Sequence, residues 1–210
     1  MITVTSQSDA QTEELAAQLA ERLEAGDVLA LDGALGAGKT SFVRGLARGL
    51  GIDPARVSSP TYIICHVYER ADGAQLIHID AYRIGSDDEL ESVGWQEMLD
   101  ERRGIIVVEW ADRIADALPE NIIRIHFEHL SENERRITIE INSDSGNRLC
   151  GWKPDPDSAD EAPCRTCGTM IAPDSPYWPF CSTRCQNLDL HRWFSGQYTM
   201  SRPLNEDDLL

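Results

Sequence analysis

Apolar and polar positions alternate along the first part of the chain with periods that predict helices and buried strands in turn. Leucines recur at helical spacing over residues 15–23, and Ser8 or Asp9 precedes them as a helix cap. We expect Gly26 to end this helix, because glycine readily adopts the backbone conformation that follows a last helical turn. The apolar run 28–31 then predicts a short strand buried on both faces, as in a parallel sheet.

A second helix, a hairpin and further strands are expected downstream. Apolar residues between positions 42 and 50 recur at helical spacing, with glycines at the end of the run. The β-rich runs 61–69 and 75–80 flank turn residues and predict a hairpin. Residues 87–100 predict a helix in two pieces, broken near Gly94. The later strands are expected at residues 104–109, 122–127 and 136–141.

This order of elements indicates the fold class and the domain organisation. Parallel-type strands that alternate with helices, together with antiparallel pairs, predict an α/β fold of the P-loop NTPase type, with a mixed sheet and flanking helices. Residues 143–161 are rich in Pro, Asp, Ser and Gly and are typical of a linker. We therefore expect a first domain at 1–142 and a small zinc-ribbon or zinc-knuckle domain at 162–210.

Composition and charge narrow the classes of function. The chain has 210 residues and a formal net charge of -17, so it repels nucleic acid, and we expect tRNA to be contacted only indirectly. No apolar run approaches the roughly 20 residues that span a bilayer. The N-terminus lacks the basic region and apolar core of a signal peptide. We expect a cytoplasmic protein without membrane contact.

Residues 33–40 match the phosphate-binding pattern G-x-x-x-x-G-K-[ST] at every fixed position. Glycines let the backbone approach phosphates closely, and the following helix presents its positive end to them. Lys39 is expected to reach the β- and γ-phosphates, and the Thr40 hydroxyl to bind Mg²⁺. Because no guanine-reading Asn-Lys-x-Asp occurs, ATP is favoured over GTP. The expected nucleotide contacts are Gly33, Leu35, Gly36, Ala37, Gly38, Lys39, Thr40 and Ser41.

A P-loop site also needs a carboxylate that holds Mg²⁺ or orients water, and two strand ends offer one. Glu109 ends the strand 105–108, and Asp80 ends the strand 76–79. The alternatives are a surface acid for Glu109 and, for Asp80, a helix cap or a salt bridge to Arg83.

Three further types of side chain near these elements are open to two interpretations. Trp110 either stacks on a ring of the nucleotide, substrate or partner, or packs in the core. Thr61 either senses the γ-phosphate as a switch residue or starts a strand. His66 and His78 are interpreted as histidines on strand faces rather than as ligands or bases.

The first domain resembles a known family. Its segments 35–40 (Leu-Gly-Ala-Gly-Lys-Thr), 59–62 (Ser-Pro-Thr-Tyr), 78–83 (His-Ile-Asp-Ala-Tyr-Arg) and 108–111 (Val-Glu-Trp-Ala) carry the resemblance, with Glu89-Leu90 and Gly94 between them. Over about residues 5–142 the chain resembles TsaE (also called YjeE). This family is the bacterial ATPase needed to make threonylcarbamoyladenosine at position 37 of tRNAs that read ANN codons.

The resemblance implies a P-loop ATPase that docks on the TsaB–TsaD pair. In that family TsaD performs the carbamoyl transfer, and TsaE hydrolyses ATP to reset the complex between turnovers. It implies that Thr40 and Glu109 serve Mg²⁺ and that Lys39 serves the phosphates. The remaining implied roles are a switch for Thr61, catalysis or partner coupling for Asp80, and contact with the nucleotide for Trp110.

A cysteine cluster marks the C-terminal part of the chain. Cys164-x-x-Cys167 and Cys181-x-x-x-Cys185 supply four thiolates in two close pairs, and Gly168 permits a tight turn after the first pair. Such spacing predicts one tetrahedral Zn²⁺, and four protein ligands without a free position indicate a structural site. Two disulfides are the alternative. The segment has few aliphatic residues, so metal binding would supply its folding energy.

The residues around these cysteines resemble YacG, a small zinc protein described as an inhibitor of DNA gyrase that binds the gyrase B subunit. The match covers about residues 162–204 and rests on the segment 176–185, on Asp189-Leu190 and Arg192-Trp193, and on Tyr198. It implies the gyrase B subunit as a partner of the zinc module. The alternative is a zinc-stapled interaction module for another protein.

Two other functions remain open. The first is a small-molecule kinase on the same P-loop framework, for which Arg83, Arg102 and Arg103 are the available lid arginines. The second is a zinc-dependent gyrase-binding module whose ATPase domain is regulatory.

Overall fold

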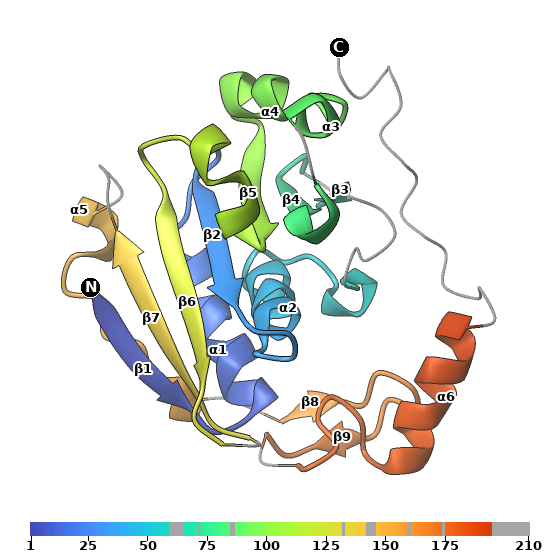
Figure 1. The fold of residues 1–210 in the computed structure, drawn as a ribbon. Helices are drawn as coiled ribbons and strands as arrows, with labels where there is room; N and C mark the ends of the chain where they lie inside the picture. Colours follow the sequence, from blue (N-terminus) through green and yellow to red (C-terminus); the bar gives the residue numbers. More distant parts are fainter. Residues whose placement is uncertain are drawn as a thin grey trace.

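A seven-stranded mixed sheet forms the centre of the first domain (Figure 1). The computed structural model describes residues 1–58, 65–70, 72–84, 87–131, 133–141, 146–158, 161–173 and 175–194. The strand order is β1-β7-β6-β2-β5-β4-β3. The strands are β1 (Ile2–Ser6), β2 (Val28–Gly33), β3 (Cys65–Glu69), β4 (Gln75–Asp80), β5 (Gly104–Glu109), β6 (Ile123–His129) and β7 (Arg135–Ile141).

The pairing of the strands confirms the mixed α/β sheet expected from the sequence. β2 runs parallel to β5 and β6, and β4 runs parallel to β5. The pairs β1–β7, β6–β7 and β3–β4 are antiparallel. The carboxyl ends of β2, β4 and β5 therefore meet at one edge of the sheet, where α/β proteins bind ligands.

Helices cover both faces of the sheet. On one face, α1 (Asp9–Ala20) and α2 (Lys39–Gly49) pack against side chains such as Leu29 and Leu31. On the other face, Val28 and Ala30 belong to the core beneath the remaining helices. This alternation follows from the two-residue period of a strand. The helices of the second face are the short η2 (Ala81–Arg83), α3 (Asp87–Glu91), α4 (Trp95–Glu101) and η3 (Ala111–Ala117) (Figure 1).

The two helices of the first face approach each other closely because α2 carries glycine at the contact. A Cβ atom at Gly45 would lie 2.1 Å from the carbonyl oxygen of Glu13, and one at Gly49 would lie 2.5 Å from that of Ala17. No side chain fits in that space, so glycine is required for this approach. The contact fixes α2, and with it the P-loop, relative to α1.

Two features of the N-terminal part differ from the sequence predictions. The first helix ends at Ala20 rather than at Gly26. Its cap is Ser8, one of the two expected caps, which accepts a hydrogen bond from the N–H of Gln11. The chain turns early because Asp27 accepts a hydrogen bond from the N–H of Glu24 at 2.7 Å and competes with continued helix. The strand β1 was not predicted.

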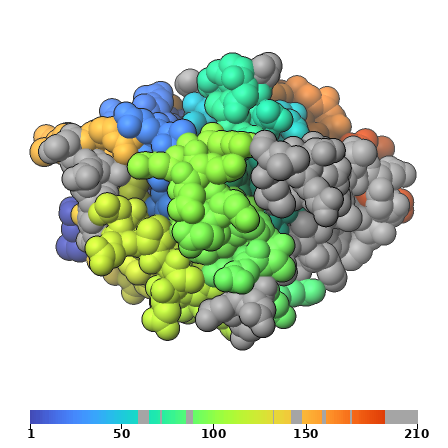
Figure 2. All heavy atoms as spheres, turned by 90° about the horizontal axis from the view of Figure 1, so that it is seen from above, coloured from blue at the N-terminus to red at the C-terminus, as the bar shows by residue number. Residues whose placement is uncertain are grey.

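The rest of the chain adds a short helix and turn and a small cysteine-bearing module. After α5 (Gly146–Leu149), the turn η4 (Pro156–Ser158) runs along α1. The zinc module consists of β8 (Ala162–Pro163), β9 (Met170–Ile171) and α6 (Thr183–Phe194). Seen from above, α5 and the zinc module lie at opposite ends of the molecule, with α3 and α4 between them (Figure 2). None of the described helices is long and apolar enough to cross a membrane.

Candidate functional site

The P-loop connects the end of β2 to the start of α2. Its backbone turns through positive φ angles at Gly36 (77°) and Gly38 (102°), a conformation that disfavours any residue with a Cβ. Between them Ala37 is buried, whereas the side chain of Leu35 at the loop tip is 86% exposed. Helix α2 begins directly after Gly38, and Ser41 lies buried in its first turn. The N–H groups of this turn therefore face the space enclosed by the loop.

The Lys39 side chain folds back over the loop. Its Nζ donates hydrogen bonds to the carbonyl oxygens of Gly33 at 2.7 Å and Ala34 at 3.0 Å. The same ammonium lies 3.8 Å from the centre of the Trp110 ring, a cation–π contact. Burial lowers the pKa of Lys39, and the charge of Glu109 opposes this change. The cation is thus held at the mouth of the loop.

Glu109 meets Thr40 although the two residues are 69 positions apart in the sequence. The Thr40 hydroxyl donates a hydrogen bond of 2.9 Å to Glu109 Oε1. The same oxygen lies 3.0 Å from Nε2 of His78, whose side chain is fully buried. Burial alone would raise the pKa of Glu109, but the hydrogen bonds from His78 and Thr40 and the charge of Lys39 outweigh it and lower the pKa. Glu109 is therefore an ionised carboxylate inside the protein.

Asp80 occupies the register position opposite Glu109 on the parallel pair β4–β5. Its Oδ1 accepts a hydrogen bond of 2.9 Å from the N–H of Tyr82 and so caps the short helix η2. Burial raises the pKa of Asp80, and the nearby charge of Glu109 adds to the increase. The two acids thus differ in protonation behaviour, because their environments shift the pKa values in opposite directions.

The turn after Glu109 is fastened to the end of β2. Trp110 has a positive φ of 59°. Its N–H donates to the carbonyl oxygen of Leu31 at 3.0 Å, and the N–H of Asp112 donates to Oδ1 of Asp32 at 3.0 Å. The ring of Tyr82 lies 5.1 Å from that of Trp110. These contacts hold the indole over Lys39, and the half-buried side chain also packs against the hydrophobic core, so both interpretations of Trp110 apply in part.

A buried arginine lies beneath the P-loop. A Cβ atom at Gly38 would lie 3.1 Å from Nη1 of Arg135, a residue of β7. This guanidinium is paired with Asp9 and donates to the Thr12 hydroxyl at 3.2 Å. Arg135 therefore links the loop to the first turn of α1.

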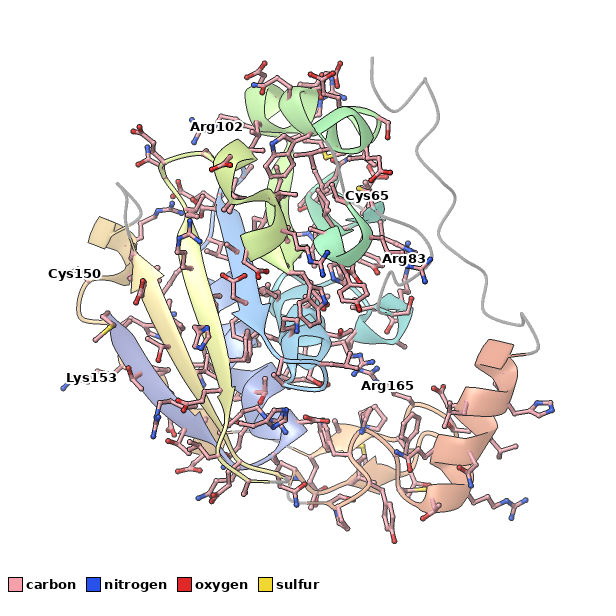
Figure 3. The ribbon with its side chains drawn as sticks, viewed as in Figure 1. Cys65, Arg83, Arg102, Cys150, Lys153 and Arg165 are labelled. Carbon is pink, nitrogen blue, oxygen red and sulfur yellow. The ribbon has the colours of Figure 1, made fainter. Side chains whose placement is uncertain are left out.

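Most of the residues that we expected at the nucleotide site lie at this edge of the sheet. Lys39, Thr40, Asp80, Glu109 and Trp110 are brought together by the contacts above. Thr61, the expected switch residue, lies outside the described residues. Of the three arginines considered as lid residues, Arg83 follows β4 at this edge, whereas Arg102 and Arg103 precede β5 at the opposite one (Figure 3).

The four clustered cysteines form a second site. All six cysteines of the chain are free thiols, so the alternative of two disulfides does not hold here. The Sγ atoms of Cys164, Cys167, Cys181 and Cys185 lie within 4.8 Å of one another. Sγ of Cys181 lies 3.5 Å from that of Cys167 and 3.6 Å from that of Cys185. A tetrahedral Zn²⁺ with Zn–S bonds of about 2.3 Å requires sulfur atoms about 3.8 Å apart, so the cluster fits this ion.

The electrostatics of the cluster also suit a cation. Hydrogen bonds from the hydroxyl and the N–H of Thr169 lower the pKa of Cys167 to about 6, which favours the thiolate that binds metals. Burial and the neighbouring thiols raise the pKa of Cys185 to about 12. Four thiolates cannot all be charged at this separation without a cation among them, and Zn²⁺ supplies that charge.

Two residues of the nucleotide site were not assigned to it from the sequence. His78 lies on a strand face, as interpreted, but it also supports Glu109. One signal was available, because His78 stands two residues before Asp80 and therefore shares its strand face. No local pattern marks Arg135, which reaches the loop only because of the order of the strands.

Comparisons with known proteins give two family matches along the chain. Residues 6–137 match the family model "Threonylcarbamoyl adenosine biosynthesis protein TsaE". Residues 162–209 match the model "DNA gyrase inhibitor YacG".

Relatives of known sequence and structure resemble the first of these parts. A protein of Treponema pallidum named tRNA threonylcarbamoyladenosine biosynthesis protein TsaE is 42% identical over 117 residues, which are 56% of this chain and 84% of the relative. The protein of that name from Bacillus subtilis is 39% identical over 141 residues, covering 67% and 85%. The crystal structure of YdiB from Bacillus subtilis superimposes with a TM-score of 0.55 at 30% identity, covering 71% of this chain and 90% of YdiB. The chain therefore belongs to the family of threonylcarbamoyl adenosine biosynthesis protein TsaE.

Proposed function

We propose that this chain binds ATP with Mg²⁺ in its P-loop and hydrolyses it as the ATPase subunit needed to make threonylcarbamoyladenosine at position 37 of tRNA. TsaB and TsaD are its proposed partners, and hydrolysis is stimulated in their presence. The family match supports the pathway. The observation that supports the proposal most directly is the hydrogen bond between Thr40 and Glu109, which joins the P-loop to an ionised carboxylate at the end of the neighbouring strand.

The proposed binding roles follow from the contacts of each group. The backbone N–H groups of residues 36–41 bind the phosphates, and Lys39 exchanges its carbonyl partners for the β- and γ-phosphate oxygens. Thr40 and Glu109 hold Mg²⁺, since a hydroxyl and a carboxylate are the oxygen ligands that this ion prefers. When bound, the ion offsets the negative charge of the phosphates. Trp110 covers the bound nucleotide from the side on which its ring now covers Lys39.

Asp80 is the proposed proton acceptor for the attacking water. Water adds to the γ-phosphorus, the bond to ADP breaks, and the proton of the water passes to a carboxylate. Asp80 suits this step better than Glu109, because burial raises the pKa of Asp80 while hydrogen bonds lower that of Glu109. A base needs a pKa closer to the working pH, and a metal ligand needs a permanent charge.

A small-molecule kinase is the competing function. Kinases close an arginine-bearing lid over the phosphates, and two of the three arginines considered for that role lie at the far edge of the sheet. Of the three, Arg83 lies at the phosphate edge, as the last residue of the short helix η2 that begins after Asp80. Hydrolysis therefore agrees better with the described residues than transfer to a second substrate.

The test measures phosphate release by the full chain alone and with TsaB and TsaD. We expect slow hydrolysis by the chain alone, stimulation by the two proteins, and formation of threonylcarbamoyladenosine in tRNA only when all are present. Lys39→Ala is expected to abolish each of these. Phosphate transferred to a metabolite instead of water would establish the kinase, and unstimulated turnover would remove TsaB and TsaD as partners.

For the C-terminal part we propose a division at residues 143–161, with a zinc module at 162–210 that binds a protein. The gyrase B subunit is the proposed partner, on the strength of the YacG match. The test is retention of the full chain on immobilised gyrase B subunit, with Cys164→Ser/Cys167→Ser as the variant that lacks the metal. Binding that survives loss of the metal, or no binding at all, would refute this assignment.

A further inference from the structure

The outer face of α1 is covered by the C-terminal part of the same chain. Ala10 is only 1% exposed and forms an apolar cluster with Ile171 and Trp178 of the zinc module. The linker covers the next turns of the helix. The side-chain amide of Gln18 donates to the carbonyl oxygen of Asp155 at 2.8 Å and accepts from its N–H at 2.9 Å. Linker and module therefore lie on one continuous surface.

An acid of α1 is buried where the zinc module approaches it. Glu13 is 4% exposed, and its Oε1 has no hydrogen-bond partner among the described residues. Nη2 of Arg165 lies 3.6 Å from this oxygen, at the place where the module faces the first domain (Figure 3). Burial raises the pKa of Glu13, and Arg165 is the foremost cation that opposes the increase. Because Arg165 stands between Cys164 and Cys167, a folded metal site sets its position.

From α1 two contacts lead to the phosphate site. The carbonyl group of Glu13 packs on Gly45 of α2, the helix that starts at the P-loop. The preceding residue, Thr12, accepts a hydrogen bond from Arg135, whose guanidinium lies beneath Gly38 of the loop. A shift of α1 would therefore disturb both the loop and the helix that follows it.

We propose that the zinc module is a brace for the phosphate-binding loop: it docks on α1 through Ala10 and Glu13, so that loading Zn²⁺ on the four cysteines stabilises α1 and the P-loop together. The module has few aliphatic residues, and its fold depends on the metal. Loss of the metal uncovers Ala10 and removes the cation that best offsets the burial of Glu13. Stability would fall locally in α1 and α2, because the contacts described above between the module and the rest of the chain are made to Ala10 and Glu13 of α1, which packs on α2. This linkage is independent of ATP hydrolysis and of gyrase binding.

The test is hydrogen–deuterium exchange of the full chain without nucleotide, with zinc bound and after its removal by a chelator. Peptides that cover residues 9–20 and 33–49 report the brace, and a peptide that covers β4 is the internal reference. We expect exchange in the first two to become at least about tenfold faster after zinc removal, with β4 unchanged.

Two variants separate docking from metal binding, and a third is a matched control. Arg165→Met removes the cation, and Ala10→Gln places a longer polar side chain in the apolar contact without altering the module. Both should show the faster exchange while zinc content, measured by elemental analysis, stays at one per chain. Arg184→Met also changes an arginine next to a zinc ligand, but Arg184 is exposed, so this variant should behave as wild type. Equal exchange with and without zinc, or equal exchange in all three variants, would overturn the proposal.

Discussion

Replacement of His78 by phenylalanine tests whether the buried imidazole positions the Glu109 carboxylate, which we assign to Mg²⁺, and keeps it ionised. Oε1 of Glu109 has two partners among the described residues, the Thr40 hydroxyl at 2.9 Å and Nε2 of His78 at 3.0 Å. Phenylalanine fills the space of the ring and removes the hydrogen bond. The carboxylate is then held by Thr40 alone, and its pKa rises because the His78 hydrogen bond is the foremost influence that lowers it.

The expected magnitude follows from the chemistry of this hydrogen bond. A hydrogen bond to a charged group contributes about 1.5–3 kcal/mol. If this free energy is lost from Mg²⁺ binding, because Glu109 is less well ordered, the Mg²⁺ concentration for half-maximal hydrolysis should rise roughly 10- to 150-fold. The effect on the rate at saturating Mg²⁺ should be smaller, since Lys39 and the loop backbone are unchanged. His78→Gln keeps an N–H donor and should recover part of the Mg²⁺ affinity.

The assay is a Mg²⁺ titration of phosphate release at saturating ATP, with TsaB and TsaD present. His66→Phe is the matched control: His66 is buried, stands opposite His78 on β3, and belongs to no contact with Glu109 among the described residues. Unfolding in urea establishes that both variants are folded before rates are compared. If the two variants have the same half-maximal Mg²⁺ concentration, His78 does not position Glu109 and the reasoning fails.

Three further changes probe the acid, the helix contact and the buried arginine. Asp80→Asn should abolish turnover yet raise the thermal midpoint at neutral pH, because a carboxyl whose pKa is raised by burial stabilises the folded state only below that pKa. In the wild type, the acidic limb of the pH–rate profile should lie at a higher pH than for an ordinary aspartate. A lower thermal midpoint in the variant would contradict the raised pKa of Asp80. Gly45→Ala should destabilise the domain by about 1–3 kcal/mol in urea unfolding, since its Cβ would lie 2.1 Å from the Glu13 carbonyl oxygen, and an unchanged midpoint would show that the helices separate freely. Arg135→Met should destabilise the domain by about 1.5–3 kcal/mol and weaken ATP binding, because the guanidinium that links Gly38 of the loop to Thr12 of α1 is removed. Urea unfolding checks the first effect, and nucleotide titration checks the second.

Local patterns predicted most elements of the fold. Continuous apolar runs marked β2 and β5, a β-rich run marked β4, and helical spacing marked α2. Gly94 does separate α3 from α4. β1 was missed because the run Ile2–Ser6 is short and gains its place by pairing with β7, where Ile2 lies opposite Ile139. Such a distant pairing leaves no local trace. The end of the first helix was misplaced because a side chain, Asp27, competes for the backbone.

The residues of the candidate site likewise divide into those that local sequence predicts and those that depend on distant contacts. The glycines and Lys39 act through a continuous segment, so their spacing is sufficient to predict a phosphate loop. The pairing of Thr40 with Glu109 requires that β2 and β5 be neighbours, which the strand order establishes and the sequence only suggests. Arg135 and the docking of Arg165 on Glu13 depend on contacts between segments more than 90 residues apart, so neither was predictable from spacing.

The most direct test of the central claim is equilibrium dialysis of labelled ATP against the full chain with Mg²⁺, in the presence of TsaB and TsaD. We expect saturable retention that falls at least about 100-fold in affinity for Lys39→Ala, because that change removes the cation that pairs with the β- and γ-phosphates. No retention by the wild-type chain, or an equal affinity in Lys39→Ala, would contradict the assignment of the P-loop as an ATP site.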